Sequence, residues 1–198
     1  NENVFAYTNK IGDEKVIVIY NNSYEQTSGR IKFSFGKIYK LQNGNKEFRR
    51  KSISEALDLK TNDDYFYIFK DSKTNLEFIR SAKELANEGL YAHLFGYNYH
   101  VFWNFREVKD NNGEYRNICS HLNGKAVYSI ELTMKELKLE KLHNNIIDFF
   151  NKNNLNELKT ICGFDGEDNL KLSNYLKTKI NSILSELKSY FNIHLDDE

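Results

Sequence analysis

Apolar and polar residues alternate with a period of two through most of the first half of the chain, a pattern that predicts β-strands. The runs cover 4–7, 16–20, 31–35, 65–69, 76–80, 90–94 and 97–108. Gly12, Asp13 and Glu14 lie between the first two runs and are typical of a hairpin loop. We therefore expect antiparallel strands joined by short turns.

The run at 97–108 is the longest of these predicted strands. One set of alternate positions is almost entirely apolar: Tyr97, Tyr99, Val101, Trp103 and Phe105. The other set is Asn98, His100, Phe102, Asn104 and Arg106. Because successive side chains of a strand point to opposite faces, we expect the first set, with Trp103, to face the core.

Two short helices are predicted within the strand-rich half. Ser52 with Glu55, and Ser81 with Glu84, have the spacing of a capping box. Gly89 is expected to end the second helix as a C-terminal glycine.

The pattern becomes helical after a polar break at 109–113. Helices are predicted at 115–122, 130–139, 142–150, 155–162 and 170–191. Gly163 is expected to end the helix at 155–162. The last carries an apolar stripe of Leu172, Leu176, Ile180, Ile183, Leu184, Leu187 and Phe191. Strands followed by helices indicate the α+β class. We predict an antiparallel Greek-key β-sandwich at 1–108 and a C-terminal helical subdomain at 113–194.

Composition narrows the choice of partners. The 198 residues carry 28 basic and 28 acidic side chains, and this balance argues against a nucleic-acid-binding protein. No apolar run reaches the 18 residues that a membrane span needs. Proline is absent and the first residue is Asn1, so we expect a piece of a longer protein. The sequence does not determine the cellular location of that protein, and the cytoplasm is the favoured expectation.

The sequence shows few candidates for catalytic, metal-binding or redox residues. The adjacent acidic pairs, Asp13-Glu14, Asp63-Asp64 and Asp196-Asp197, fall in predicted turns or at the terminus. The five histidines show no metal-binding spacing, and no GxSxG, GxGxxG or P-loop pattern occurs. Cys119 and Cys162 are interpreted as ordinary thiols, with a single bridge or a redox role as the alternative. We predict no catalytic residue, no metal and no cofactor.

Two binding hypotheses remain. Exposed aromatic rings can pack against the apolar face of a sugar, and Tyr99, His100 and Trp103 are the candidate carbohydrate contacts. The stripe on the last helix could instead bind a protein partner, although it is equally the pattern of a helix that packs on its neighbours.

Several segments resemble one family. Val4-Phe5-Ala6-Tyr7, followed by Gly12-Asp13-Glu14 and by 15–22, is similar to the start of the C-terminal β-domain of the α-amylase family of glycoside hydrolases. Further segments similar to a bacterial subgroup of that family lie at 67–71, 76–81, 89–91, 97–102 with 105–108, and 122–125 with 129–130, so the resemblance covers about 3–150. Ala126-Val127-Tyr128 departs from it, because a glycine and a proline are expected there.

The resemblance implies a non-catalytic role. Family members cleave or transfer α-glucosidic bonds with an Asp nucleophile and a Glu acid/base on a (β/α)8 barrel, which needs about 250 residues. No residue of this chain can inherit those roles. The chain would brace the barrel of its parent protein, with α-glucan as a further partner; a free-standing carbohydrate-binding module and a helix-mediated interaction module are the alternatives.

Overall fold

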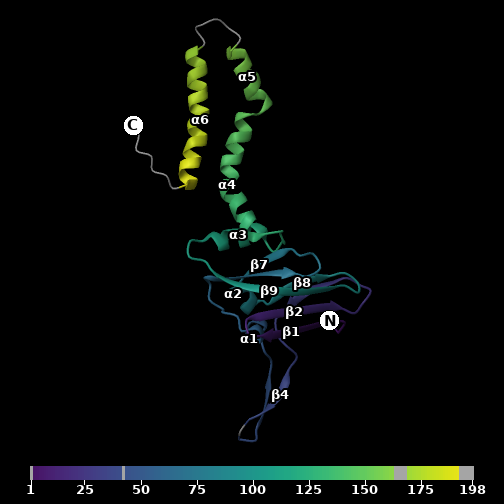
Figure 1. The fold of residues 1–198 in the computed structure, drawn as a ribbon. Helices are drawn as coiled ribbons and strands as arrows, with labels where there is room; N and C mark the ends of the chain where they lie inside the picture. Colours follow the sequence, from purple (N-terminus) through teal and green to yellow (C-terminus); the bar gives the residue numbers. More distant parts are fainter. Residues whose placement is uncertain (1, 42, 163–168, 192–198) are drawn as a thin grey trace. The chain divides into compact units, whose positions relative to one another are not determined.

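The computed structural model describes residues 2–41, 43–162 and 169–191. The chain divides into two compact units, Asn1–Thr133 and Met134–Glu198. The predicted α+β class is confirmed, with a large antiparallel sheet and several helices (Figure 1). The division falls later than the predicted break at 109–113, because helix α3 (Glu114–Leu122) packs against the sheet and belongs to the first unit.

Unit 1 contains all the strands of the described residues. They are β1 (Val4–Ile11), β2 (Glu14–Asn21), β3 (Thr27–Ile31), β4 (Lys37–Lys40), β5 (Lys46–Arg49), β6 (Tyr65–Asp71), β7 (Glu77–Ser81), β8 (Leu90–Leu94) and β9 (Tyr99–Lys109). Two short helices lie among them, α1 (Ile53–Leu57) and α2 (Ala82–Asn87). Five strands form one antiparallel sheet in the order β1-β2-β9-β6-β7, while β3-β8 and β4-β5 form separate pairs.

The core lies on one face of the five-stranded sheet, which we call the inner face. Ile17, Ile19, Tyr67, Phe69 and Phe102 point to it from the central strands and are buried. Side chains of α1, α2 and β8 close this layer from the other side: Ile53, Leu57, Ala82, Leu85, Leu90, Ala92 and Leu94. The inner face is therefore a conventional hydrophobic core between a sheet and a mixed layer.

Local capping signals fix the two short helices. Ser52 and Glu55 form the complete capping box, because the Ser52 side chain accepts from the Glu55 N–H and the Glu55 carboxylate accepts from the Ser52 N–H. Ser81 accepts from the Glu84 N–H in the same way. Both N-termini were predicted from these residues and are confirmed.

The predicted core face of β9 is wrong for most of its residues. Trp103 is 43% exposed and Tyr99 is 45% exposed, whereas Phe102 is buried. The alternation itself holds up to Trp103 but has the opposite orientation, and a β-bulge then changes the face: Ile68 pairs with Arg106 and Lys70 with Trp103, so Asn104 and Phe105 together face Phe69. Asn104 takes the left-handed conformation, with φ 53°, that the bulge needs.

The bulge therefore reverses the alternation along β9. Phe102 and Phe105 both reach the inner face although three positions separate them, and both contact the Phe69 ring. Tyr99 and Trp103 on β9, and Tyr97 just before it, are left exposed, and the predicted apolar side was correct only at Phe105.

Gly89 is expected to be intolerant of any side chain. Its φ is +83°, and an added Cβ would lie 2.3 Å from the Ile31 carbonyl oxygen, so Gly89→Ala combines backbone strain with a steric clash. We expect a loss of about 2–3 kcal/mol in the free energy of unfolding. Denaturant titration checks this, with Gly29→Ala as the control, because Gly29 has open space around it and should be nearly neutral. Equal losses in the free energy of unfolding for Gly89→Ala and Gly29→Ala would contradict this prediction.

Unit 2 consists of helices. They are α4 (Ile130–Phe149), which starts at the end of unit 1, α5 (Lys152–Cys162) and α6 (Asn169–Phe191). The predicted helices at 130–139 and 142–150 are one continuous helix, α4. No helix in the described part of the chain is long and apolar enough to cross a membrane.

The apolar stripe of α6 is only partly covered. Ile180 and Leu184 are exposed, while Leu176, Ile183 and Leu187 are half-buried. Lys179 forms an ion pair of 2.6 Å with Asp148 of α4. The Leu172 and Phe191 side chains, the predicted stop at Gly163 and the end of the subdomain at 194 lie outside the described residues.

Candidate functional site

The second face of the five-stranded sheet, the outer face, is covered over only part of its width. Beside β6 and β7 it is closed by α3 and the start of α4, where Ile68, Ile79, Ile118, Leu122 and Ile130 are buried. Beside β1, β2 and the first half of β9, the outward side chains are all partly or fully exposed. The candidate site is this open half.

Strand register aligns the open side chains in rows. Phe5 pairs with Tyr20, and Tyr20 pairs with Tyr99, so three aromatic residues cross β1, β2 and β9 side by side. The next row is Tyr7, Val18 and Val101. With Val16 and Trp103 these residues make up the outer aromatic face. Neighbouring strands lie about 4.8 Å apart, which makes the surface continuous.

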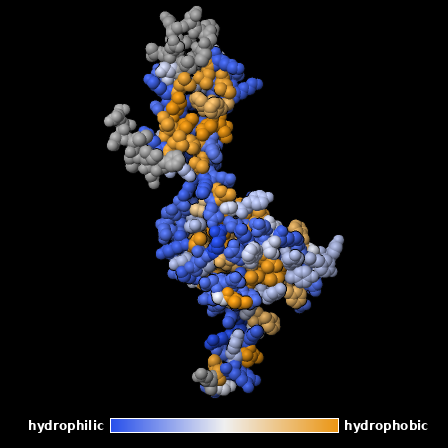
Figure 2. All heavy atoms as spheres, in the orientation of Figure 1, coloured by the Kyte–Doolittle hydropathy of each residue, from blue (hydrophilic) through white to orange (hydrophobic). Residues whose placement is uncertain are grey.

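The outer aromatic face brings eight neighbouring aromatic and valine side chains together on one surface. Phe5, Tyr7, Tyr99 and Trp103 are exposed, and Tyr20 and the three valines are half-buried. Hydrophobic residues are visible at the surface of this unit in Figure 2. Single exposed apolar residues are ordinary, but a contiguous patch of this kind marks an interaction surface.

The structure brings two of the three predicted carbohydrate contacts together. Tyr99 and Trp103 share the outer aromatic face, whereas His100 points the opposite way. The His100 Nδ1 atom lies 3.1 Å from Asp71 Oδ2, and its Nε2 atom lies 3.0 Å from the His93 carbonyl oxygen. His100 is thus engaged by protein groups. Sequence reasoning missed the aromatic residues contributed by β1 and β2, although their alternation was visible.

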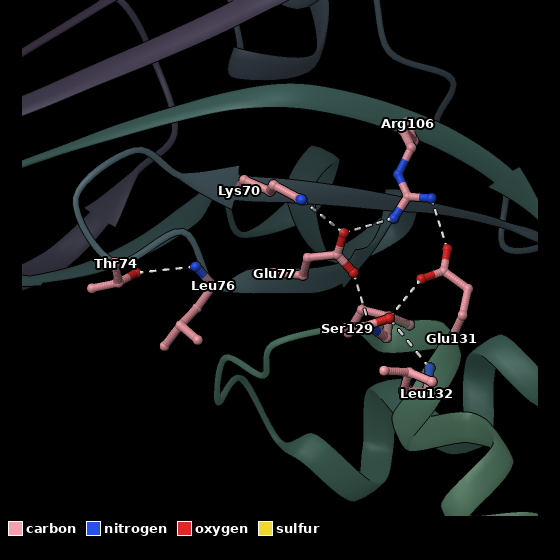
Figure 3. Close-up of polar contacts among 9 residues, drawn as sticks. Lys70, Thr74, Leu76, Glu77, Arg106, Ser129, Glu131 and Leu132 are labelled. Atoms are coloured by element: carbon pink, nitrogen blue, oxygen red, sulfur yellow. Dashed lines mark hydrogen bonds and ion pairs between the residues drawn. The ribbon is translucent and has the colours of Figure 1, made fainter.

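A cluster of charged side chains lies on the covered half of the outer face, beside the start of α4 (Figure 3). The Glu77 side chain is only 6% exposed. Its Oε1 atom accepts from Arg106 Nη2 at 3.0 Å and lies 3.7 Å from Lys70 Nζ, while Oε2 accepts from the Ile130 N–H at 2.9 Å. The carboxylate therefore binds two cations and the first turn of α4, where helix N–H groups favour negative charge.

Arg106 extends the cluster to the protein surface. Its Nη1 atom donates to Glu131 Oε1 at 2.7 Å, and Ser129 Oγ donates to the other Glu131 oxygen at 3.2 Å. Backbone hydrogen bonds between Glu77 and Val127, of 2.7 and 2.9 Å, close the edge of β7 beside it. Both carboxylates have protein partners, so the cluster joins the first turn of α4, which belongs to unit 1, to the sheet.

The Arg106–Glu131 contact makes a small pH-dependent contribution to stability. The hydrogen bond from Arg106 lowers the pKa of Glu131 below its ordinary value of 4.5. A lowered folded-state pKa stabilises the fold above the unfolded value, and this contribution is lost as the pH falls through the folded pKa. Because Glu131 is largely exposed, we expect this contribution to the free energy of unfolding to be less than about 1 kcal/mol. Denaturation curves at pH 7 and pH 3 measure it, and the contribution should be absent in Glu131→Gln. Identical pH dependence in the two proteins would contradict this.

A second polar cluster lies on the inner face near the end of β9. The Tyr67 hydroxyl donates to Glu107 Oε2 at 2.8 Å and accepts from the Lys60 N–H at 2.6 Å, and Lys60 Nζ lies 2.6 Å from Glu107 Oε1. Burial raises the pKa of Tyr67 above its usual range. Burial also acts to raise the pKa of Glu107, but the hydrogen bonds from Lys60 and Tyr67 outweigh it and lower that pKa. The polar groups of Tyr67, Lys60 and Glu107 therefore satisfy one another's hydrogen-bonding capacity.

Nucleophilic and metal chemistry find no support among the described residues. Cys119 is a free, partly buried thiol, and burial raises its pKa, which disfavours the reactive thiolate. The Cys162 side chain lies outside the described part of the chain. No group of three or more His, Cys, Asp and Glu side chains that could hold a metal ion occurs in the residues that the structure describes.

The chain has no recognisable relatives in any of three comparisons. No protein-family model matches it, and neither a curated protein nor a solved structure does.

Proposed function

We propose that the chain is the non-catalytic C-terminal region of an α-amylase-like glycoside hydrolase, and that its outer aromatic face packs against the catalytic (β/α)8 barrel of the parent. The observation that carries the proposal is the open half of the sheet, where Phe5, Tyr7, Tyr20, Tyr99 and Trp103 lie uncovered. Burying such a surface against a neighbouring domain stabilises both, at about 25 cal/mol per Å² of apolar surface.

The segments that resemble the family form this same surface. The motif 4–7 lies in β1, 15–22 in β2 and 97–108 in β9, and these three strands carry the outer aromatic face. The Greek-key β-sandwich of an α-amylase C-terminal domain is part of the proposal. In support of it, β3-β8 lies over the inner face of the five-stranded sheet.

The polar clusters favour a bracing role over a catalytic one. Glu77 and Asp71 are the most buried carboxylates described, and each is held by side-chain or backbone partners of the fold. A retaining glycosidase needs two carboxyl groups about 5–5.5 Å apart in an accessible cleft. The role proposed for this chain requires none.

An activity assay and the parent gene test the proposal together. The purified chain incubated with amylose is expected to release no reducing ends, and the reading frame upstream of Asn1 is expected to encode a barrel with an Asp nucleophile and a Glu acid/base. Hydrolysis by the chain alone, or an upstream frame without a barrel, would contradict the proposal.

Glucan binding is the second candidate function, and one observation favours it. Tyr99 and Trp103 lie exposed on one face of the sheet, where aromatic rings could pack on sugar rings. Affinity electrophoresis in glycogen tests this directly. If the face binds glucan, wild-type chain is retarded and the Tyr99→Ala/Trp103→Ala variant is not; unretarded migration of the wild type removes this candidate.

A further inference from the structure

Unit 1 carries a strongly basic segment that the balanced charge of the whole chain conceals. Residues 32–51, the basic arm, comprise β4, β5 and their flanks. They contain seven basic side chains and one acidic side chain, a net charge of +6. The basic residues are Lys32, Lys37, Lys40, Lys46, Arg49, Arg50 and Lys51. The rest of the chain, with 21 basic and 27 acidic side chains, is therefore net acidic, and the excess of positive charge lies on and beside one hairpin, which Figure 1 shows apart from the five-stranded sheet.

The pairing of the hairpin does not explain this charge. Lys37 pairs directly with Arg49, and Lys40 pairs with Lys46, so two of its four cross-strand pairs join like charges. Like charges directly opposite each other destabilise a strand pair. Glu47 relieves only part of this repulsion, through its 2.8 Å ion pair with Arg49. A local conflict of this kind is typical of a functional site rather than of a structural one.

Exposed aromatic rings lie among these cations. Phe35 is 94% exposed, and Phe33 and Phe48 are also largely exposed. The Lys32 ammonium lies 5.2 Å from the centre of the Phe33 ring, and the Arg50 guanidinium lies 5.8 Å from that of Phe48. The arm thus presents positive charge and ring faces side by side.

We propose that the basic arm binds single-stranded nucleic acid. Lysine and arginine side chains would neutralise successive phosphates, and the exposed phenylalanine rings would stack with bases, which is the combination that such binding requires. The aromatic rings have no comparable role against the stacked bases of a duplex.

An anionic membrane fits the arm less well. Register places Lys40, Lys46, Ile38 and Phe48 on one face of the hairpin, and Lys37, Arg49, Tyr39 and Glu47 on the other. Cations thus lie on both faces, whereas a membrane-surface element separates an apolar face from a charged one. The turn includes Asn43, Gly44 and Asn45, which are unsuited to insertion into lipid.

Fluorescence anisotropy with a labelled oligothymidylate tests the proposal. The wild-type chain is expected to bind in the micromolar range at about 50 mM salt and to weaken steeply by about 200 mM. Lys37→Glu/Lys40→Glu places an acid opposite Arg49 and another opposite Lys46. This variant should lose at least about tenfold in affinity and show a shallower salt dependence, while its thermal midpoint stays equal or rises because the like-charge pairs are gone.

Matched variants separate the arm from general charge and from the rings. Lys135→Glu/Lys141→Glu, exposed on α4, makes the same charge change elsewhere and should alter affinity by less than about twofold. Phe35→Ala keeps the charge and should lose about fivefold or more through lost stacking. The proposal is overturned if the wild type does not bind, if both double variants weaken binding equally, or if the chain binds anionic vesicles but not the oligonucleotide.

Discussion

Replacing Phe69 with alanine is expected to lower the free energy of unfolding of unit 1 by about 3–5 kcal/mol. Phe69 has no exposed surface, and its ring centroid lies 4.8 Å from that of Phe105, 5.2 Å from Phe102 and 5.7 Å from Phe78. The substitution leaves a cavity where β6, β7 and β9 meet and removes three aromatic contacts at once, each worth about 0.5–1.5 kcal/mol beyond the area it buries.

The single tryptophan makes this measurement specific to unit 1. Trp103 lies on β9, so urea titration followed by its fluorescence reports the sheet rather than the helices of unit 2. Phe35→Ala is the matched control, because Phe35 is almost fully exposed and should change stability by less than about 0.5 kcal/mol. A small effect at Phe69 would mean that the bulge does not join Phe102 and Phe105 around this ring.

Glu77→Ala is expected to cost about 2–3 kcal/mol. The substitution leaves the Ile130 N–H, which is buried at the start of α4, without its acceptor, and it takes from Arg106 and Lys70 the carboxylate that they share. Glu131→Ala is the control, since that carboxylate contacts the same arginine from an exposed position and should cost less than about 1 kcal/mol.

The two glutamates also predict different responses to salt. The Glu77 contacts are buried, so their loss should cost nearly the same at low and at high ionic strength, whereas the small effect of Glu131→Ala should shrink as salt is added. This role of Glu77 in attaching the first turn of α4 to the sheet would be contradicted by equal losses in the free energy of unfolding for Glu77→Ala and Glu131→Ala. It would also be contradicted if the loss in Glu77→Ala disappeared at high salt.

Short-range signals in the sequence predicted several elements, because each depends on neighbouring residues. The predicted strand at 31–35 is wrong, since β3 ends at Ile31 and only Phe33 beyond it forms an isolated bridge. The capping serines, Ser52 and Ser81, determined where α1 and α2 begin. Gly89 follows α2 with a positive φ, as expected of a C-terminal glycine. The β1-β2 hairpin was predicted from the residues around Gly12, and the register confirms it, with Ile11 opposite Glu14.

The core-facing side of β9 and the boundary between the two units could not be predicted, because they depend on residues far apart in the chain. Strict alternation along β9 placed Trp103 and Phe105 on one face, and only the pairing with β6 reveals that Asn104 interrupts that alternation and separates them. Likewise, the polar break at 109–113 was a true loop, but α3 beyond it returns to β7, so the compact unit continues to Thr133. The aromatic row of Phe5, Tyr20 and Tyr99 exists only once three strands are in register.

The outer aromatic face can be tested as a docking surface by isothermal titration calorimetry of the purified chain with the barrel domain that the proposed function places in the same gene. The account predicts saturable binding that is lost in Tyr7→Arg/Val18→Arg, two neighbours on that face, and kept in Tyr128→Arg, an exposed tyrosine outside it. Fluorescence of Trp103 verifies that each variant is folded. The absence of binding, or an equal loss in both variants, would contradict the account.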